Sequence, residues 1–333
     1  MRICVVGAGA IGGMLAVKLA QSGHTVSLIL RGANLAAVQA HGMTLIEESG
    51  QELQMRPACA TASLAEAGPQ DLIILGMKAH QVAAVAPELH RLLDAGSSIV
   101  TMQNGVPWWY FHKLPGPWQG IPVRSVDPDG SIAQHIPIDR VIGSVVYPAS
   151  EVIRPGVIRV IEGNRFTLGE IDGSDTPRVR AISDAFKAAG FKAPVSGDIR
   201  SEIWLKLWGN LSFNPISALT HATLEAICLF SPTRELAAGM MREAQAIGET
   251  LGVQFKVSLD KRIAGAQAVG PHKTSMLQDV EAGRPLELQA LVGAVLELGC
   301  ITGVPTPTIQ AVHALASLLA RSLSAHTAGL RLA

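Results

Sequence analysis

The chain begins Met1-Arg2-Ile3-Cys4-Val5-Val6-Gly7-Ala8-Gly9-Ala10-Ile11-Gly12, and this stretch decides the fold. A short apolar run, a G-x-G-x-x-G turn and a helical pattern predict a strand, a tight turn and a helix that together bind the pyrophosphate of a dinucleotide. Gly7 permits the turn, Gly9 lets the backbone approach the pyrophosphate, and Gly12 allows close helix packing. The alternative interpretation is a glycine turn that binds no ligand.

Four further apolar runs alternate with helical patterns, at residues 25–30, 72–75, 98–102 and 141–147. This alternation predicts βαβ units and a largely parallel sheet that contains all five runs. Residues 157–161 and 165–168 flank a turn at Glu162-Gly163-Asn164, so we expect them to pair as a hairpin and to form an antiparallel edge of that sheet.

From residue 198 onward the pattern is almost entirely helical and rich in Leu and Ala. The sequence therefore predicts two domains: a dinucleotide-binding α/β domain over 1–197, and an all-α domain over 198–333 that binds substrate and forms subunit contacts. Helices should begin or end at the prolines, because proline is tolerated in a first helical turn and breaks a helix interior. The prolines in question are Pro215, Pro232, Pro271, Pro285, Pro305 and Pro307.

Composition excludes several classes of partner. The 333 residues carry 27 Lys plus Arg and 27 Asp plus Glu, so the formal net charge is zero, and no long stretch concentrates positive charge. Nucleic acid and an anionic membrane surface are therefore not expected as partners. Only 16% of residues are charged and 48% are hydrophobic, which predicts a well-buried chain and a possible homodimer.

The sequence contains no leader-like pattern and no long uninterrupted apolar segment, so we expect a soluble, cytoplasmic protein. The four cysteines, Cys4, Cys59, Cys228 and Cys300, lack C-x-x-C spacing. We therefore expect neither a disulfide framework nor a metal site.

Arg31 follows the second predicted strand, where the adenosine ribose of a dinucleotide lies. An NAD site would have Asp or Glu here to accept from the 2′-hydroxyl, whereas an arginine suits a 2′-phosphate. NADP(H) is therefore favoured over NAD(H) as the cofactor. The alternative is an ordinary surface arginine.

Lys78 and Asn104 each follow a predicted strand, within Gly76-Met77-Lys78-Ala79 and Met102-Gln103-Asn104-Gly105. Open α/β sheets form their ligand crevice at the carboxyl ends of parallel strands, which makes both residues candidates for that crevice. Either could instead be an ordinary turn or solvated residue.

The segment from Ile199 to Pro215 carries the densest polar pattern. Lys206, Asn210 and Asn214 recur every four residues and so share one helix face, beside apolar neighbours. A lysine among apolar groups gives up its proton more readily, which suits a general acid facing a ketone oxygen. A solvated stripe on a surface helix is the alternative.

A second polar cluster runs from Lys273 to Leu288. We expect Pro285 to start a helix and to place Glu287 in its first turn, where the macrodipole favours a carboxylate. Capping is therefore the alternative to a functional role for Glu287.

Together these motifs resemble the ketopantoate reductase (2-dehydropantoate 2-reductase) family over nearly the whole chain. The most specific are Arg200-x-x-x-Trp204-x-Lys206-Leu207-x-x-Asn210-x-x-x-Asn214-Pro215 and Ser275-Met276-Leu277-Gln278-Asp279, with Glu287 beyond. The resemblance implies a Rossmann-type amino-terminal domain and a helical carboxyl-terminal domain like that of 6-phosphogluconate dehydrogenase. It also implies an NADP-dependent oxidoreductase that reduces 2-dehydropantoate, a 2-keto acid, to (R)-pantoate in pantothenate biosynthesis.

The resemblance also implies a role for each matching residue. Lys206 matches the catalytic lysine, which donates the proton to the ketone oxygen, and Glu287 matches the acid that helps to hold the lysine and the substrate. Contacts with the substrate are implied for Asn104, Asn210, Asn214 and Ser275. Contacts with the cofactor are implied for Gly7 to Gly12, Arg31, Lys78 and Asn104.

One segment departs from the family pattern. After Gly105 the chain runs Val106-Pro107-Trp108-Trp109-Tyr110-Phe111-His112-Lys113-Leu114-Pro115-Gly116-Pro117-Trp118, which places five aromatic residues where a plain polar helix is usual. These aromatics could form a lid, a pocket wall for a bulkier 2-keto acid, or a dimer contact. The segment thus favours one competing hypothesis, a related reductase that acts on such a bulkier acid. A second competing hypothesis is a non-catalytic regulator that binds NADP(H).

Overall fold

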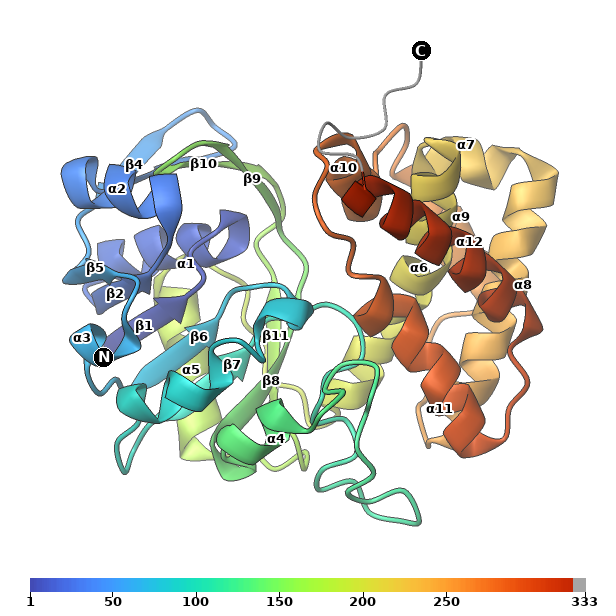
Figure 1. The fold of residues 1–333 in the computed structure, drawn as a ribbon, viewed down its shortest axis with the longest axis horizontal. Coiled ribbons are helices and arrows are strands. Elements are labelled where there is room, and N and C mark those ends of the chain that lie inside the picture. The colour runs from blue at the N-terminus through green and yellow to red at the C-terminus, as the bar shows by residue number, and fades with distance from the viewer. Residues whose placement is uncertain (326–333) are drawn as a thin grey trace. The chain divides into compact units, whose positions relative to one another are not determined.

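The computed structural model describes residues 1–325 (Figure 1). The chain forms two compact units. Unit 1 comprises Met1–Gln103, Phe111–Pro122 and Asp129–Glu202. Unit 2 comprises Asn104–Tyr110, Val123–Pro128 and the chain from Ile203 onward. The sequence predicted a single boundary after residue 197 and gave no sign that residues 104–110 and 123–128 belong with the later helices.

Unit 1 is built on a seven-stranded sheet of order β11-β8-β7-β6-β1-β2-β5. Its strands are β1 (Arg2–Val6), β2 (Thr25–Ile29), β5 (Cys59–Thr61), β6 (Leu72–Leu75), β7 (Ser98–Thr101), β8 (Val141–Val146) and β11 (Phe166–Glu170). The five runs predicted as parallel strands are all present and all parallel. Numbered along the chain within the sheet, the order is the 3-2-1-4-5-6 of a dinucleotide-binding sheet, with an antiparallel seventh strand.

Burial explains why these runs are strands. All four residues of β6 and of β7 are buried, and Val5 lies between Leu28 on one side and Ile74 on the other. A sheet buried on both faces requires continuous apolar strands of this kind. The order reverses between β1 and β6, so the ligand crevice of the fold is expected beside the turns that follow these two strands.

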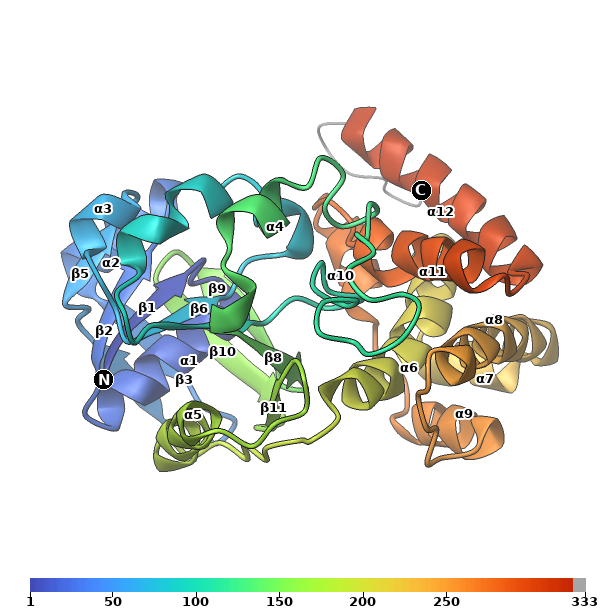
Figure 2. The same ribbon diagram turned by 90° about the horizontal axis from the view of Figure 1, so that it is seen from below.

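The predicted hairpin is wrong. β10 (Val157–Glu162) pairs with β9 (Ala149–Arg154) and β3 (Met43–Ile46), and β4 (Glu52–Met55) completes a second sheet of four strands. β11 instead pairs with β8, so the predicted antiparallel edge exists but has a different partner. The second sheet packs on α1 (Ala10–Gln21), and Figures 1 and 2 show α1 beside both sheets.

The remaining helices of unit 1 are short, apart from α5, which Figure 2 shows next to β11. The α-helices are α2 (Gly32–His41), α3 (Leu64–Ala67), α4 (Ser131–His135) and α5 (Pro177–Ala188). The 3-10 segments are η1 (Ala79–Gln81), η2 (Ala86–Leu92) and η3 (Ile138–Arg140).

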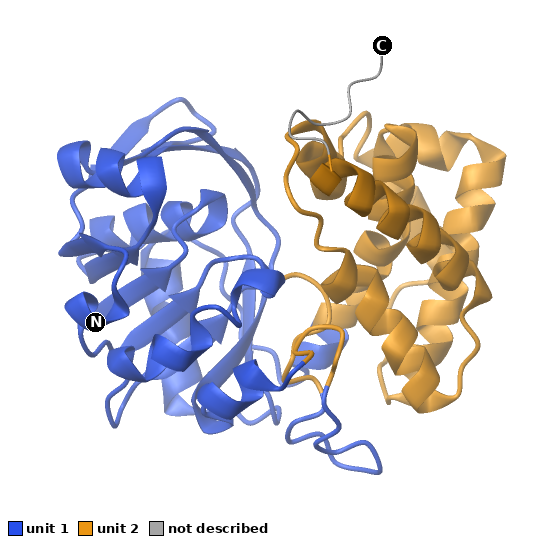
Figure 3. Cartoon of the chain, viewed as in Figure 1, with its two compact units in different colours: residues 1–103, 111–122, 129–202 blue, residues 104–110, 123–128, 203–333 orange. Residues whose placement is uncertain are grey.

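From residue 198 to residue 325 the chain is almost entirely helical, and no strand occurs in that part, as the sequence predicted. Its elements are α6 (Ile199–Thr220), α7 (Leu224–Leu229), α8 (Ser231–Thr250), α9 (Leu259–Ala268), α10 (Ser275–Glu281), the π-helical η4 (Gln289–Gly293), α11 (Ala294–Thr302) and α12 (Pro307–Ala325). An α/β unit followed by a helical unit confirms the predicted fold class. Figure 3 shows both units, with the two early segments coloured as unit 2.

Two helix boundaries differ from the prediction. α6 continues through Pro215 to Thr220, although proline lacks the N–H for a helical hydrogen bond. Almost every residue from Leu207 to Ala218 is buried, and this packing outweighs the local cost of the proline. Pro285 does not start a helix: η4 begins at Gln289, so Glu287 lies just before a helical segment and not within its first turn.

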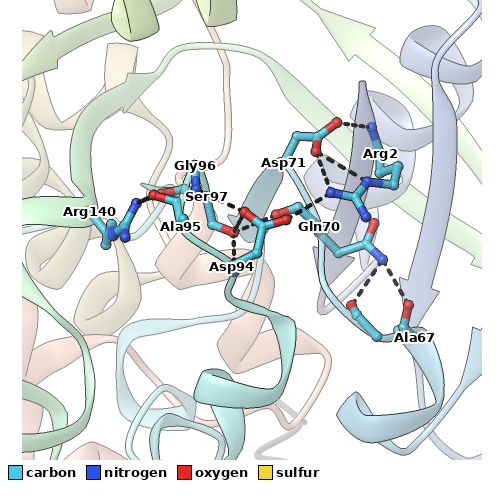
Figure 4. A network of polar contacts seen from close by, with 10 residues as sticks. Arg2, Ala67, Gln70, Asp71, Asp94, Ala95, Gly96, Ser97 and Arg140 are labelled. Carbon is cyan, nitrogen blue, oxygen red and sulfur yellow. Dashed lines mark hydrogen bonds and ion pairs between the residues drawn. The ribbon is translucent and has the colours of Figure 1, made fainter.

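A polar network ties together the amino-terminal ends of β1, β6 and β7 (Figure 4). The Arg2 guanidinium binds Asp71 and Asp94 at 2.7 and 2.8 Å. Hydrogen bonds from Arg2 hold the pKa of Asp71 below its usual range. A carboxyl with a lowered folded pKa contributes stability that is complete above its unfolded pKa, about 4, and is lost as the pH falls below it.

Replacing Arg178 with glutamine is expected to lower the free energy of unfolding by about 2 kcal/mol. The carboxylate of Glu170 is buried and accepts from Arg178 Nε and Nη2 at 2.7 and 2.6 Å, so the substitution leaves a buried charge unpaired. The expected loss of stability is smaller than that for a fully buried ion pair because Arg178 is one third exposed. Urea unfolding measures the change. Arg180→Gln, which breaks an exposed ion pair between α5 and Asp175 just before it, should have no measurable effect; a loss equal to that of Arg178→Gln would contradict this expectation.

Candidate functional site

The glycine-rich turn is shaped by contacts with the turn that follows β6. Gly7 has φ +90°, and a Cβ there would lie 2.9 Å from the Met77 backbone nitrogen. A Cβ on Gly12 would lie 2.5 Å from the Gly7 carbonyl oxygen, so both positions need glycine for the protein itself to pack.

Gly9 is different, because a Cβ there would meet no protein atom within 4 Å. Gly9 is also the N-cap of α1, and no side chain caps this helix end. Free backbone N–H groups at a helix amino terminus, reached through open space, suit an anion such as a pyrophosphate. The residues present therefore fit a dinucleotide, as the sequence indicated.

Asn34, which the sequence analysis did not single out, holds this turn in place. Its Nδ2 donates to the Ala8 carbonyl oxygen at 3.2 Å, and its Oδ1 accepts from the Gly156 N–H at 2.7 Å. The side chain thereby connects the glycine-rich turn to the loop between β9 and β10. No local sequence signal marks such a long-range bond.

The other cofactor candidates of unit 1 follow the two strands that flank β1. Arg31 is exposed and precedes α2, just beyond the end of β2, and Lys78 is partly buried and precedes η1, just beyond β6. Gln103, also missed in the sequence, donates to the carbonyl oxygens of Leu75 and Met77 at 2.8 and 3.0 Å. Through these two bonds, Gln103 fastens the turn after β6, which contains Lys78, to the end of β7.

In unit 2 the structure brings Lys206, Asn104 and Glu287 together. Lys206, on α6, donates from Nζ to Asn104 Oδ1 at 2.6 Å. Burial lowers the pKa of Lys206 from its usual value to about 8, and the negative charge of Glu287 opposes part of that shift. The ammonium of Lys206 is therefore destabilised, yet still mostly protonated at neutral pH, and it gives up its proton more readily than an ordinary lysine.

Asn104 and Glu287 lie on two segments that contact each other. Gly105 has φ +89°, and a Cβ there would collide with the Ala290 carbonyl oxygen. The Val106 N–H donates to that same oxygen at 2.9 Å. Ala290 belongs to the π-helical η4, which begins two residues after Glu287. The glycine at position 105 thus lets the segment carrying Asn104 lie directly on the segment that follows Glu287.

Three other predicted substrate residues also lie in unit 2. Asn210 is partly buried one turn after Lys206, and Asn214 is buried one turn further along α6. Ser275 is exposed at the first position of α10, whose N-cap is Thr274.

The first part of the aromatic segment, residues 106–111, is part of the protein interior, whereas Trp118 is only partly buried. Trp108, Trp109, Tyr110 and Phe111 are all buried, and Trp109, Tyr110 and Phe111 are at most 1% exposed. Side chains buried in this way do not provide a surface for a dimer contact. Tyr110 instead accepts a hydrogen bond from Trp204 Nε1 at 2.7 Å.

Within residues 1–325, no group of three or more His, Cys, Asp and Glu side chains is placed to hold a metal ion. No helix in the same range combines the length and the hydropathy that a bilayer crossing needs. What the arrangement offers chemically is a proton donor with a lowered pKa, an amide, a carboxylate and a separate anion-binding turn.

Comparison with known proteins agrees with these features. The ketopantoate reductase PanE/ApbA model matches residues 3–113, and its C-terminal model matches residues 198–320. A curated 2-dehydropantoate 2-reductase of Mesorhizobium japonicum is 56% identical over 96% of this chain and 98% of its own. A Ralstonia solanacearum structure, provisionally named a ketopantoate reductase, is 40% identical with TM-score 0.92, covering 97% and 98% of the two chains.

A 2-dehydropantoate 2-reductase structure from Methylococcus capsulatus is 27% identical with TM-score 0.83, covering 99% of this chain and all of the other. Both family models and a relative above half identity thus match this chain. The chain belongs to the ketopantoate reductase PanE/ApbA family of oxidoreductases.

Proposed function

We propose that this protein reduces 2-dehydropantoate to (R)-pantoate with NADPH, a step of pantothenate biosynthesis. The observation that carries the proposal is the Lys206–Asn104 hydrogen bond beside Glu287, in a chain 56% identical to a 2-dehydropantoate 2-reductase. Ketone reduction needs a hydride donor and a group that stabilises the developing alkoxide, and a positioned ammonium supplies the second.

The cofactor would be held by the turn from Gly7 to Gly12, with its pyrophosphate at the amino terminus of α1. When bound, NADPH supplies the hydride that adds to the ketone carbon. Lys206 hydrogen-bonds the ketone oxygen and transfers its proton to that oxygen as the C–O double bond becomes single, and it recovers a proton from water afterwards. Asn104 orients the ammonium of Lys206, because its amide oxygen accepts one of the three N–H bonds.

The remaining polar residues of unit 2 are assigned to Lys206 and the substrate, and Lys78 of unit 1 to the cofactor. Glu287 favours the charged form of Lys206 and so keeps the proton available at neutral pH. Asn210 and Asn214 follow Lys206 along α6 and supply amides for the hydroxyl side of the substrate. Ser275 is assigned to the substrate carboxylate, and Lys78 to the nicotinamide end of the cofactor. The expectations of a homodimer and of a cytoplasmic location stay predictions.

Arg31→Ala is expected to weaken NADPH binding roughly 10- to 100-fold, because it removes a charge-assisted hydrogen bond to the 2′-phosphate. NADH lacks that phosphate, so its dissociation constant should change little. Titration of cofactor fluorescence measures both constants. Arg56→Ala, an exposed arginine elsewhere in unit 1, is the control. Equal weakening of both cofactors would show that Arg31 does not read the 2′-phosphate.

A panel of 2-keto acids tests the substrate assignment. We expect the highest kcat/KM for 2-dehydropantoate, with bulkier acids such as phenylglyoxylate turned over less well. Faster turnover of a bulkier acid would assign the chain to a related reductase. Absence of turnover with every acid, while NADPH still binds, would favour a regulator that has lost the chemistry.

A further inference from the structure

The bond between Trp204 and Tyr110 joins the helix that carries the proton donor to the segment that carries its partner. Trp204 lies on α6 two residues before Lys206, and Tyr110 lies six residues after Asn104. The Trp204 indole N–H donates to the Tyr110 hydroxyl oxygen at 2.7 Å, and both side chains are at most 1% exposed. A buried hydrogen bond of this kind is short, shielded from water and costly to break.

The segment from Asn104 to Tyr110 is therefore fastened at both ends to the same helix. At one end Lys206 Nζ donates to Asn104 Oδ1 at 2.6 Å, and at the other Trp204 donates to Tyr110. Between them, the Val106 N–H donates to the Ala290 carbonyl oxygen, next to Gly105. A segment without a helix or strand of its own is held in one conformation by these three contacts.

We propose that Trp204 and Tyr110 are positioning residues for the reduction, because their hydrogen bond holds the segment from 104 to 110 in the place where Asn104 can orient Lys206. The inference rests on the proposed function. Neither residue is assigned any contact with substrate or cofactor; both act through Asn104. The buried aromatic segment then has a role that differs from the lid, the pocket wall and the dimer contact considered from the sequence.

The physical reason is that proton transfer depends steeply on geometry. A displacement of about 1 Å at a reacting group can cost on the order of 100-fold in rate. Loosening Tyr110 would let Asn104 move from Lys206, and the ammonium would lose an acceptor that favours its charged form. The pKa of Lys206 would then fall further. Glu287 is the charged group that raises the pKa of Lys206, and this contribution would be unchanged.

The experiment compares Tyr110→Phe and Trp204→Phe with Trp208→Phe in the full chain. Tyr110→Phe removes only a hydroxyl and is the milder variant. Trp208 is a matched control because it is also fully buried on α6 and also lies against Phe255, while its indole N–H donates to the Met241 carbonyl oxygen and not to the segment. Steady-state kinetics with 2-dehydropantoate and NADPH are recorded against pH, together with thermal unfolding.

We expect Tyr110→Phe and Trp204→Phe each to lower kcat roughly 5- to 10-fold, the size of one lost hydrogen bond. The fall of kcat at high pH should begin at lower pH than in the wild type, and the NADPH dissociation constant should not change. The double variant should be no worse than the poorer single variant, because both remove the same bond. Trp208→Phe should lower the unfolding temperature without moving the pH profile.

The decisive test introduces Tyr110→Phe into a protein that already carries Asn104→Ala. If Tyr110 acts through Asn104, Tyr110→Phe will cause no further loss of kcat in this background. A further loss of the same size, or an unshifted pH profile in Tyr110→Phe, would overturn the positioning role. If the wild type itself does not reduce 2-dehydropantoate, the proposed function is wrong. The wild-type assay therefore distinguishes a failure of the proposed function from a failure of the positioning role.

Discussion

Lys206→Met is expected to lower kcat roughly 1,000-fold, the usual contribution of general acid catalysis. Methionine keeps most of the length and apolar surface of the lysine stem but has no proton to donate and no charge to stabilise an alkoxide. Because burial disfavours the Lys206 ammonium, removing it should not destabilise the fold. NADPH affinity should be retained, because the glycine-rich turn belongs to unit 1.

The wild-type pH profile provides an independent check on this role. The reduction needs protonated Lys206, so kcat/KM, which reports the free enzyme, should be level below the pKa of about 8 and fall tenfold per pH unit above it. Lys206→Met should show no such fall. Lys187→Met, which removes an exposed lysine of α5, should match the wild type. Retention of more than a tenth of wild-type kcat in Lys206→Met would contradict the assignment.

Gly9→Ala is expected to raise the NADPH dissociation constant roughly 10- to 100-fold while leaving stability unchanged. The added methyl group meets no protein atom within 4 Å, but it occupies the open side of the turn by which the pyrophosphate must approach. Isothermal titration calorimetry gives the affinity, and thermal unfolding without cofactor gives the stability.

Gly12→Ala should behave differently, because its methyl group lies 2.5 Å from the Gly7 carbonyl oxygen. We expect this variant to lose about 1–3 kcal/mol of stability as well as cofactor affinity. Gly265→Ala, at an open position of α9, is the control: it should keep NADPH affinity and lose no stability, because alanine favours a helix over glycine. If Gly9→Ala bound NADPH normally, the cofactor would not approach the turn as proposed.

The sequence predicted the core of the fold because the relevant signals are local. The glycine-rich turn between β1 and α1 is recognisable from six residues, and strands such as β6 are apolar throughout. The second sheet was missed because β4 is mostly exposed and its residues alternate poorly. The hairpin prediction failed because β10 takes β9 and β3 as partners, and the choice between strand partners depends on tertiary contacts that a local pattern does not contain.

The same distinction holds for the candidate site. Helical spacing places Asn210 and Asn214 on the face of α6 that carries Lys206, so that face was readable from the sequence. The bond from Lys206 to Asn104 spans 102 positions, and the bond from Trp204 to Tyr110 spans 94. Such contacts depend on the fold of unit 2. The sequence likewise left a lid, a pocket wall and a dimer contact open for the aromatic residues, and the burial of Trp108, Trp109, Tyr110 and Phe111 is visible only in the structure.

The measurement that tests the central claim most directly is the stoichiometry of the reaction. The wild-type protein is mixed with 2-dehydropantoate and NADPH, the loss of NADPH absorbance is followed, and pantoate is quantified by chiral chromatography. We predict one (R)-pantoate per NADPH consumed, with NADH giving much slower turnover. No consumption of NADPH above the enzyme-free blank, or consumption without formation of (R)-pantoate, would contradict the proposed function.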